Sequence, residues 1–357
     1  MADIIQYKCP NCGGYLEFNS SLQKLKCPFC DSVFSTQEFP EFSADSQPDD
    51  IHVSHPNESY AGPDSENFGI YHCESCGAEI IADESLASTT CPYCSNNIIL
   101  TDRLAGELKP DYIIPFKYDK KAAKEALRKH FSGKSLLPKV FSSENHLDEV
   151  KGIYVPYWLY DAKAVAEGTY KMTKVRTWSD LNYNYTETNH YTAFRRGNVT
   201  FIKVPVDAAR SIPNEITESL ETFDYSGLSE FKTAYLSGYY ANRYDVSSDE
   251  CIKRAQERIK QSAESELRET VKGYSTVSPI SGKTTLTDLS IKYALFPVWI
   301  LNTTWRGKQY TFAMNGQTGK FVGDLPVDKW IYWKWRLLYS GLIGAALFGI
   351  SVLLQNM

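Results

Sequence analysis

The sequence predicts an α+β protein with two small four-cysteine units at the front, an α+β domain in the middle and one hydrophobic helix at the end. Three observations predict this organisation. Eight of the nine cysteines fall into four CxxC pairs, helix and strand patterns alternate between residues 111 and 326, and an uncharged apolar stretch covers residues 337–354. A length of 357 residues, with 43% apolar and 23% charged residues, fits about two globular domains and excludes a wholly disordered chain.

The cysteine pairs form two sets with the same spacing. In each set 14 residues separate the inner cysteines, and the candidate ligands are Cys9, Cys12, Cys27 and Cys30, followed by Cys73, Cys76, Cys91 and Cys94. Two thiolates three positions apart can face one ion, and a second such pair completes a tetrahedral shell. Gly13 and Gly77 follow the first pair of each set, where glycine lets the backbone turn toward sulfur. We therefore predict two zinc ribbons, at residues 1–37 and 68–101, each with one Zn²⁺.

Two other interpretations of the cysteines remain open. Disulfides would need an oxidising compartment, but the chain opens with Met1-Ala2-Asp3 and shows no apolar leader. Iron in a rubredoxin-like site would use the same ligands and would make the protein an electron carrier. A closed sulfur shell leaves no open coordination position, so we expect no hydrolytic chemistry at these ions. Because each ribbon is small, its ion should supply most of its stability.

The charge distribution bears on the class of partner. Residues 1–110 contain five basic and seventeen acidic residues, whereas residues 111–357 have a net charge of +7 and the whole chain −5. Nucleic-acid binding depends on cations that contact phosphates, so this acidic N-terminal segment, in which the second ribbon has no Lys or Arg and the first is near neutral, favours protein partners. A nucleic-acid-binding factor in replication or transcription is the alternative, supported by Lys8, Lys24 and Lys26 in the first ribbon. The acidic, Pro/Ser-rich stretch 38–67 predicts a flexible linker.

The middle of the chain, residues 111–326, predicts a sheet with helices on it. Strand patterns cover 111–117, 153–178, 183–206, 294–305 and 308–322, and helical patterns cover 119–132, 214–222 and 248–271. The last helix carries one apolar stripe, typical of a helix laid on a sheet, formed by Ile252, Ala255, Ile259, Ala263 and Leu267. Cys251, beside the stripe, is expected to be a small packed residue.

A repeated pattern indicates an internal duplication of a helix followed by a β-hairpin. Pro156-Tyr157-Trp158-Leu159 follows the first long helix, and Pro297-Val298-Trp299-Ile300 follows the second. Two such halves would give an α+β domain with pseudo-twofold symmetry.

The chain lacks a convincing catalytic motif. Ser281-Gly282-Lys283-Thr284 resembles the end of a P-loop, but Val277 stands where that motif needs glycine. The common metalloprotease, hydrolase and dinucleotide motifs are absent from the sequence. The scattered His130, His146 and His190 are expected at the surface. We therefore predict a protein that is not an enzyme and has no catalytic residues.

The C-terminal stretch predicts a transmembrane helix. Residues 337–354 are uncharged and would extend about 27 Å, enough for a thin bilayer. The preceding segment 330–336 mixes aromatic and basic residues like an interfacial belt. The flanking cations would keep the N-terminal bulk in the cytoplasm, giving a tail-anchored, single-pass protein of the cell membrane. The small residues Gly341, Ala345 and Gly349 lie four apart and predict close helix packing in a homo-oligomer.

Several of these segments together resemble one bacterial family. The matching segments are the knuckles CPNCGG, CPFC, CESCG and CPYC, the stretches Pro297-Val298-Trp299 and Phe312 to Lys320, and Gly323-Asp324-Leu325-Pro326. They are similar to the membrane-anchored tandem zinc-ribbon proteins of the YdjG type, often labelled primosomal-helicase-like or TFIIB-type zinc ribbon proteins. The resemblance implies a cytosolic partner of the phage-shock-protein-A or flotillin type, in envelope stress. Our leading hypothesis is a non-enzymatic scaffold that recruits proteins to the membrane.

Overall fold

The computed structural model describes residues 4–5, 7–39, 68–72, 79–83, 86–90, 97–100, 109–142 and 149–355. The predicted linker falls almost entirely outside these ranges, as do His146 and the second set of cysteines. The helices are α1 (Lys120–Phe131), α3 (Asn214–Leu220), α4 (Ser248–Glu269) and α5 (Lys329–Gln355), with 3₁₀ turns at Lys139–Ser142, Tyr225–Gly227 and Thr233–Leu236.

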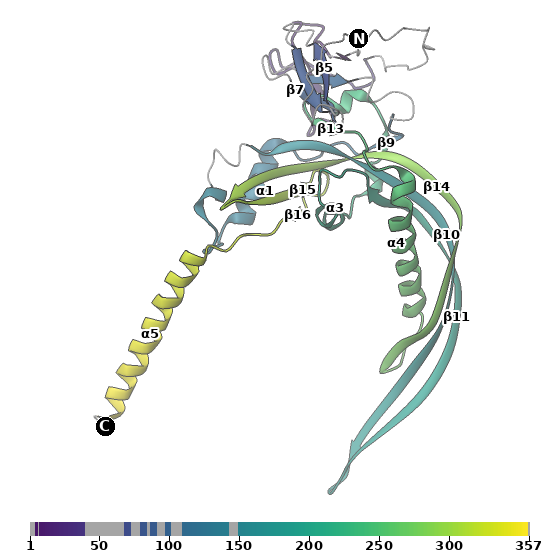
Figure 1. Cartoon of the computed structure of the whole chain (residues 1–357), viewed down its shortest axis with the longest axis vertical. Coiled ribbons are helices and arrows are strands. Elements are labelled where there is room, and N and C mark those ends of the chain that lie inside the picture. The colour runs from purple at the N-terminus through teal and green to yellow at the C-terminus, as the bar shows by residue number, and fades with distance from the viewer. Residues whose placement is uncertain are drawn as a thin grey trace.

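Strands account for more of the described residues than helices do (Figure 1). In chain order they are β1 (Ile4–Ile5), β2 (Glu17–Asn19), β3 (Lys24–Lys26), β4 (Val33–Phe34), β5 (Phe68–His72), β6 (Glu79–Asp83), β7 (Leu86–Thr90), β8 (Asn97–Leu100), β9 (Tyr112–Ile113), β10 (Lys151–Ser179), β11 (Asn184–Asp207), β12 (Ser229–Glu230), β13 (Tyr240–Asn242), β14 (Thr276–Trp305), β15 (Lys308–Asn315) and β16 (Phe321–Val322).

The two longest strands form the centre of the main sheet. β10 and β14 pair antiparallel, from Lys151 opposite Ile300 to Thr173 opposite Thr276. On its outer side β10 pairs first with β13 in parallel and then with β11, while β14 pairs first with β9 in parallel and then with β15. β7 and β8 extend the sheet beyond β13 and carry β1 at their edge. β2, β3 and β4 form a separate small sheet.

The strand order divides the domain into two halves of the same design. Each half runs strand, helix, long strand and hairpin partner: β9, α1, β10 and β11, then β13, α4, β14 and β15. The parallel pair begins at Ile153 in the first half and at Ala294 in the second, and the hairpin pairing begins at Tyr157 and at Val298. The duplicated arrangement is therefore visible in the hydrogen bonding of the sheet.

The two halves exchange a tryptophan contact. Trp158 Nε1 donates to the Val246 carbonyl at 2.9 Å, just ahead of the N-cap of α4, and Trp299 Nε1 donates to the Tyr118 carbonyl at 3.0 Å, just ahead of the N-cap of α1. Each indole thus fixes the start of the helix that belongs to the other half. The helix starts are also capped locally, because Ser247 accepts a hydrogen bond from the Glu250 amide.

Beyond the body, β10, β11 and β14 continue as a long curved arm, with α4 along one face (Figure 1). α4 presents its buried stripe to small residues of β10, and this contact is formed by Ile259, Ala263 and Leu267 with Ala162, Ala164 and Ala166. Small side chains on the strand let the helix approach the sheet closely. At its base, α4 is held by ion pairs of Arg254 and Arg258.

The structure corrects the predicted fold class in two respects. The protein contains more strand than helix. One reason is that β14 already begins at Thr276, so that residues 276–291, which are polar and include Pro279 and Gly282, form strand where no element was predicted. The predicted transmembrane helix is also wrong: among the residues that the structure describes, no helix is long and apolar enough to cross a membrane. The stretch 337–354 belongs to α5, a longer helix whose first part carries Lys329, Lys334 and Arg336. The predicted tail-anchored, single-pass position in the cell membrane and the predicted contact with the bilayer depend on this helix, so the structure does not support them either.

Candidate metal centre

The first four cysteines lie on two turns of the same local design. In the first turn, the Cys9 amide donates to the Gly14 carbonyl and the Gly13 amide donates to the Cys9 carbonyl, at 2.6 and 2.8 Å. In the second, the Cys27 and Asp31 amides form the equivalent bonds at 2.9 and 3.1 Å. The residue after each CxxC pair has a positive φ, 75° at Gly13 and 58° at Asp31. That left-handed residue turns the chain back and leaves both thiols of the pair on the same side.

The four sulfur atoms come together as one group. Cys9, Cys12, Cys27 and Cys30 have their Sγ atoms within 4.8 Å of one another, and the Cys9–Cys30 and Cys12–Cys27 sulfur distances are both 3.5 Å. A tetrahedral site with metal–sulfur bonds of about 2.3 Å needs sulfurs about 3.8 Å apart. These residues therefore form a set that could hold one metal ion, and the sequence spacing alone was sufficient to find it.

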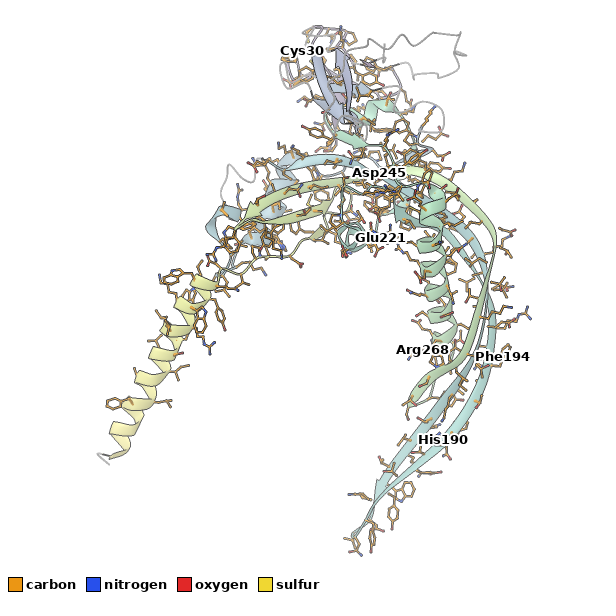
Figure 2. All side chains as sticks on the ribbon, viewed as in Figure 1. Cys30, His190, Phe194, Glu221, Asp245 and Arg268 are labelled. Atoms are coloured by element: carbon orange, nitrogen blue, oxygen red, sulfur yellow. The ribbon has the colours of Figure 1, made fainter. Side chains whose placement is uncertain are left out.

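The environments of the four thiols differ. Cys9 and Cys27 are buried, whereas Cys12 and Cys30 are exposed, and Cys30 is labelled in Figure 2. Hydrogen bonds between Cys30 and the hydroxyl and amide of Ser32 lower the pKa of Cys30 to about 6. The Gly14 amide acts to lower the pKa of Cys12, but the neighbouring thiols of Cys30 and Cys27 outweigh it and raise that pKa to about 12. Without a metal, Cys30 therefore ionises first, and ionisation of Cys12 is disfavoured by the neighbouring thiols.

Ribbon 1, residues 7–39, is packed onto the main sheet rather than held beside it. The Phe18 amide donates to the Ser237 carbonyl at 2.9 Å, and the Phe18 ring lies 5.1 Å from that of Tyr235. Gln23 Nε2 donates to the Phe116 carbonyl at 2.8 Å. The ribbon contributes buried side chains to the same apolar cluster as the sheet, namely Tyr7, Cys9, Leu16, Phe18, Leu25 and Cys27. The metal-ligand turns are thus attached directly to the protein core.

A hollow of about 540 Å³ lies where ribbon 1 meets the sheet. Its charged lining mixes both signs, and its aromatic wall comes from the sheet domain; the residues are Glu17, Asp119, Lys120, Glu149 and Lys151 with Tyr239, Tyr240 and Trp299. Burial raises the pKa of Glu17. The hollow offers charge and aromatic surface to a bound side chain, and it depends on ribbon 1 for one of its walls.

The second predicted set, Cys73, Cys76, Cys91 and Cys94, lies outside the described residues. The strands next to these cysteines are described: His72 pairs with Glu79 at the end of the β5–β6 hairpin, and Thr90 pairs with Asn97 at the end of the β7–β8 hairpin.

Other residues singled out by sequence have structural roles. Cys251 is buried, and burial raises the pKa of its thiol to about 11, as suits a packed side chain. Ser281–Thr284 lies within β14 and forms no phosphate-binding loop. His190 is exposed on the arm, but His130 is half-buried against Phe321, with ring centroids 4.2 Å apart. The prediction of a surface position was therefore wrong for His130, because α1 packs its C-terminal turn against β16.

Comparison with known proteins gives one relative over nearly the whole length. The chain is 33% identical over 349 residues, 98% of its length, to a Bacillus subtilis (strain 168) protein described as "Uncharacterized protein YdjG", of which it covers 97%. No protein-family model matches the chain, and no solved structure matches it.

Proposed function

The chain belongs to the family of Bacillus subtilis YdjG, and we propose that it is a non-enzymatic scaffold that binds other proteins on a metal-stabilised platform. The observation that carries this proposal is the attachment of the four-cysteine group to the core. Phe18, Leu16 and Leu25 belong to the same buried cluster as the sheet, so a metal at the cysteines would fix the shape of the surface around them. Four sulfur ligands would fill the coordination shell, which suits a structural role.

The proposal assigns one Zn²⁺ to each set of four cysteines. All-sulfur tetrahedral sites are typical of zinc, and sulfur spacing in the first set fits such a site. The second ion would be held by Cys73, Cys76, Cys91 and Cys94, which have the same sequence spacing. Metal analysis of purified protein should give two zinc ions per chain. Iron would instead give a red protein with strong visible absorbance.

The proposed partner is a protein, since the first 110 residues are strongly acidic and acidic surfaces repel nucleic acid. The family resemblance points to a partner of the phage-shock-protein-A or flotillin type, in envelope stress. A homo-oligomer through Gly341, Ala345 and Gly349 of α5 is part of the same proposal, and an added Cβ at Gly341 would meet nothing within 4 Å.

Crosslinking in cells, followed by identification of the captured protein, tests the scaffold. Binding of that protein to the purified chain is then measured for the unsubstituted protein and for a Cys12→Ser/Cys30→Ser variant, which keeps the two buried cysteines. Cys251→Ala, outside both sets, is the matched control. We expect the ligand variant to lose binding and the control to keep it. Equal binding by all three would refute a role for the metal-stabilised ribbon, and turnover of any substrate would refute the scaffold itself.

A nucleic-acid factor is the second candidate, favoured by the basic face of α1. A shallow hollow of about 320 Å³ on that helix is lined by four basic residues and one acidic residue, Lys120, Lys121, Lys124, Arg128 and Glu125. Cations spaced along one helix face can contact successive phosphates. Salt-dependent binding to single- or double-stranded DNA that is lost in a Lys120→Glu/Lys121→Glu variant would support this function over the scaffold.

A further inference from the structure

The outer edge of β11 is a long backbone surface with no neighbouring strand among the residues that the structure describes. β11 pairs with β10 along one side, and among the described residues no strand pairs with its other side. It runs the length of the curved arm (Figure 1). An unpaired edge presents a row of free N–H and C=O groups that can add another strand.

From Asn184 to Phe201 this edge contains neither a proline nor a bulge, two of the devices that usually block strand addition. Its ladder with β10 is regular from Asn184 to Phe201, and the irregularity comes only afterwards, near Lys203, whose φ is 57°. The other long edge of the arm, residues 276–293 of β14, is interrupted by Pro279, by two register shifts and by Asp288 with a φ of 54°. Proline and bulges disrupt an edge and discourage pairing. One edge of the arm is therefore protected and the other is open.

The two faces of β11 are clearly separated. Its odd-numbered residues face the α4 side, where Ala193 packs near Tyr170 and the Tyr191 ring lies 5.3 Å from that of Tyr274. Its even-numbered residues, among them His190 and Phe194, lie on the opposite face of the arm (Figure 2). Tyr191 is 41% and Phe194 60% exposed. A strand added at this edge would find aromatic surface on both faces.

We propose that this edge pairs antiparallel with β11 of a second copy of the chain, about a twofold axis at Tyr191. In an antiparallel pair, directly opposed residues share a face, so odd-numbered residues must oppose odd-numbered ones. Centring the pair on Tyr191 places Glu187 opposite Arg195 of the second copy, and this opposite-charge pair occurs twice. Centring it on His190 or Thr192 would place Glu187 opposite Ala193 or Gly197.

The charges of the segment favour this register. From Asn184 to Asn198, the stretch that would pair, Glu187 is the one acidic residue and Arg195 and Arg196 are the basic ones. Arg196 already contacts Glu167 of β10 at 3.2 Å, so Arg195 is the guanidinium left for a partner across the edge; its Nη1 donates to the adjacent Phe194 carbonyl at 3.1 Å. Opposite charges directly across an antiparallel pair stabilise it, and like charges destabilise it. The contact is isologous and closes on itself, so it gives a dimer and not a fibre.

A charge exchange tests the interface in the full chain. Size-exclusion chromatography with light scattering should show a dimer, and Glu187→Arg or Arg195→Glu should each weaken it by roughly tenfold or more, because each places like charges opposite each other twice. Glu187 also stands opposite Arg176 of β10 in its own chain, whereas Arg195 stands opposite Gly168, so Arg195→Glu is the decisive single change. The double variant, Glu187→Arg with Arg195→Glu, should restore the dimer. Asp288→Lys, which breaks an exposed 2.9 Å pair with Lys163 on the protected side, should leave it unchanged.

Cysteine crosslinking tests the register. Tyr191→Cys should form a disulfide between two copies on mild oxidation of the metal-loaded protein, since the two residues face each other at the axis. Tyr185→Cys, on the same strand and face, would lie about 40 Å from its counterpart and should crosslink no more than the unsubstituted chain. A monomeric full chain, equal crosslinking at both positions, or a dimer that survives either single charge change but dissociates with Gly341→Ile would each overturn the proposal.

Discussion

Replacing Phe18 by alanine should destabilise the whole sheet domain while leaving the metal ligands intact. Phe18 is 3% exposed, lies in β2 of ribbon 1 and packs into the core cluster shared with the sheet. Removing a buried phenylalanine side chain costs about 3–5 kcal/mol. For a domain of this size such a loss corresponds to a fall in the melting temperature of roughly 6–20 °C.

The matched control is Phe29→Ala in the same ribbon. Phe29 is 64% exposed, and its ring contacts Tyr15 with centroids 5.0 Å apart, so its loss should cost about 1 kcal/mol or less. Both variants keep Cys9, Cys12, Cys27 and Cys30.

Urea unfolding would measure the free energies, metal analysis would confirm equal loading, and hydrogen exchange would follow the residues that face the ribbon, 233–242. In Phe18→Ala these amides should exchange faster, because the ribbon no longer covers them. If Phe18→Ala kept its metal and cost less than about 1 kcal/mol, ribbon 1 would not be part of the domain core, and the platform would lose its physical basis.

Three further outcomes follow from contacts described above. Arg258→Met should cost about 1–3 kcal/mol in unfolding free energy, because it leaves the half-buried Glu221 carboxylate without its guanidinium, although partial exposure of the pair limits the loss. Trp158→Phe and Trp299→Phe should each cost at least about 1 kcal/mol for the lost hydrogen bond, with the larger loss at Trp299, which is 4% exposed and packs on Phe116; no loss at either position would contradict the exchanged contact. At the arm tip, two turn amides and then a tyrosine hydroxyl lower the pKa of Asp180, so its contribution is present above about pH 4 and is lost as the pH falls through its lowered folded value; amide exchange in the turn should rise on acidification, and an unchanged rate would refute this.

The sequence predicted the regular elements well where local pattern decides them. α4 was expected at 248–271 and is found at Ser248–Glu269, since its apolar stripe and its N-cap at Ser247 are local signals. The hairpin strands expected at 153–178 and 183–206 are β10 and β11. The first half of β14 was missed, because its threonine- and serine-rich sequence with Pro279 pairs with β10 over a separation of more than a hundred residues.

The grouping of the four cysteines was predictable from the sequence, but the position of the ribbon on the sheet was not. Spacing along the chain is enough to bring Cys9, Cys12, Cys27 and Cys30 together, because the two turns enclose a short hairpin. The docking of the ribbon depends on the contact of Phe18 with Ser237, which no local pattern signals. The acidic, polar stretch after the ribbon suggested that the ribbon is loosely tethered. The buried side chains of the ribbon instead belong to the same core cluster as those of the sheet.

The exchanged tryptophan contacts determine the order in which parts of the chain can fold during synthesis. The start of α1 is secured by an indole at position 299, so a growing chain cannot complete its first half until nearly all of its second half has left the ribosome. Contacts between residues so distant in the chain also slow folding. During synthesis the start of α1 therefore has only its local Asp119 cap until Trp299 emerges, and a truncated product ending before that residue would never acquire the second anchor.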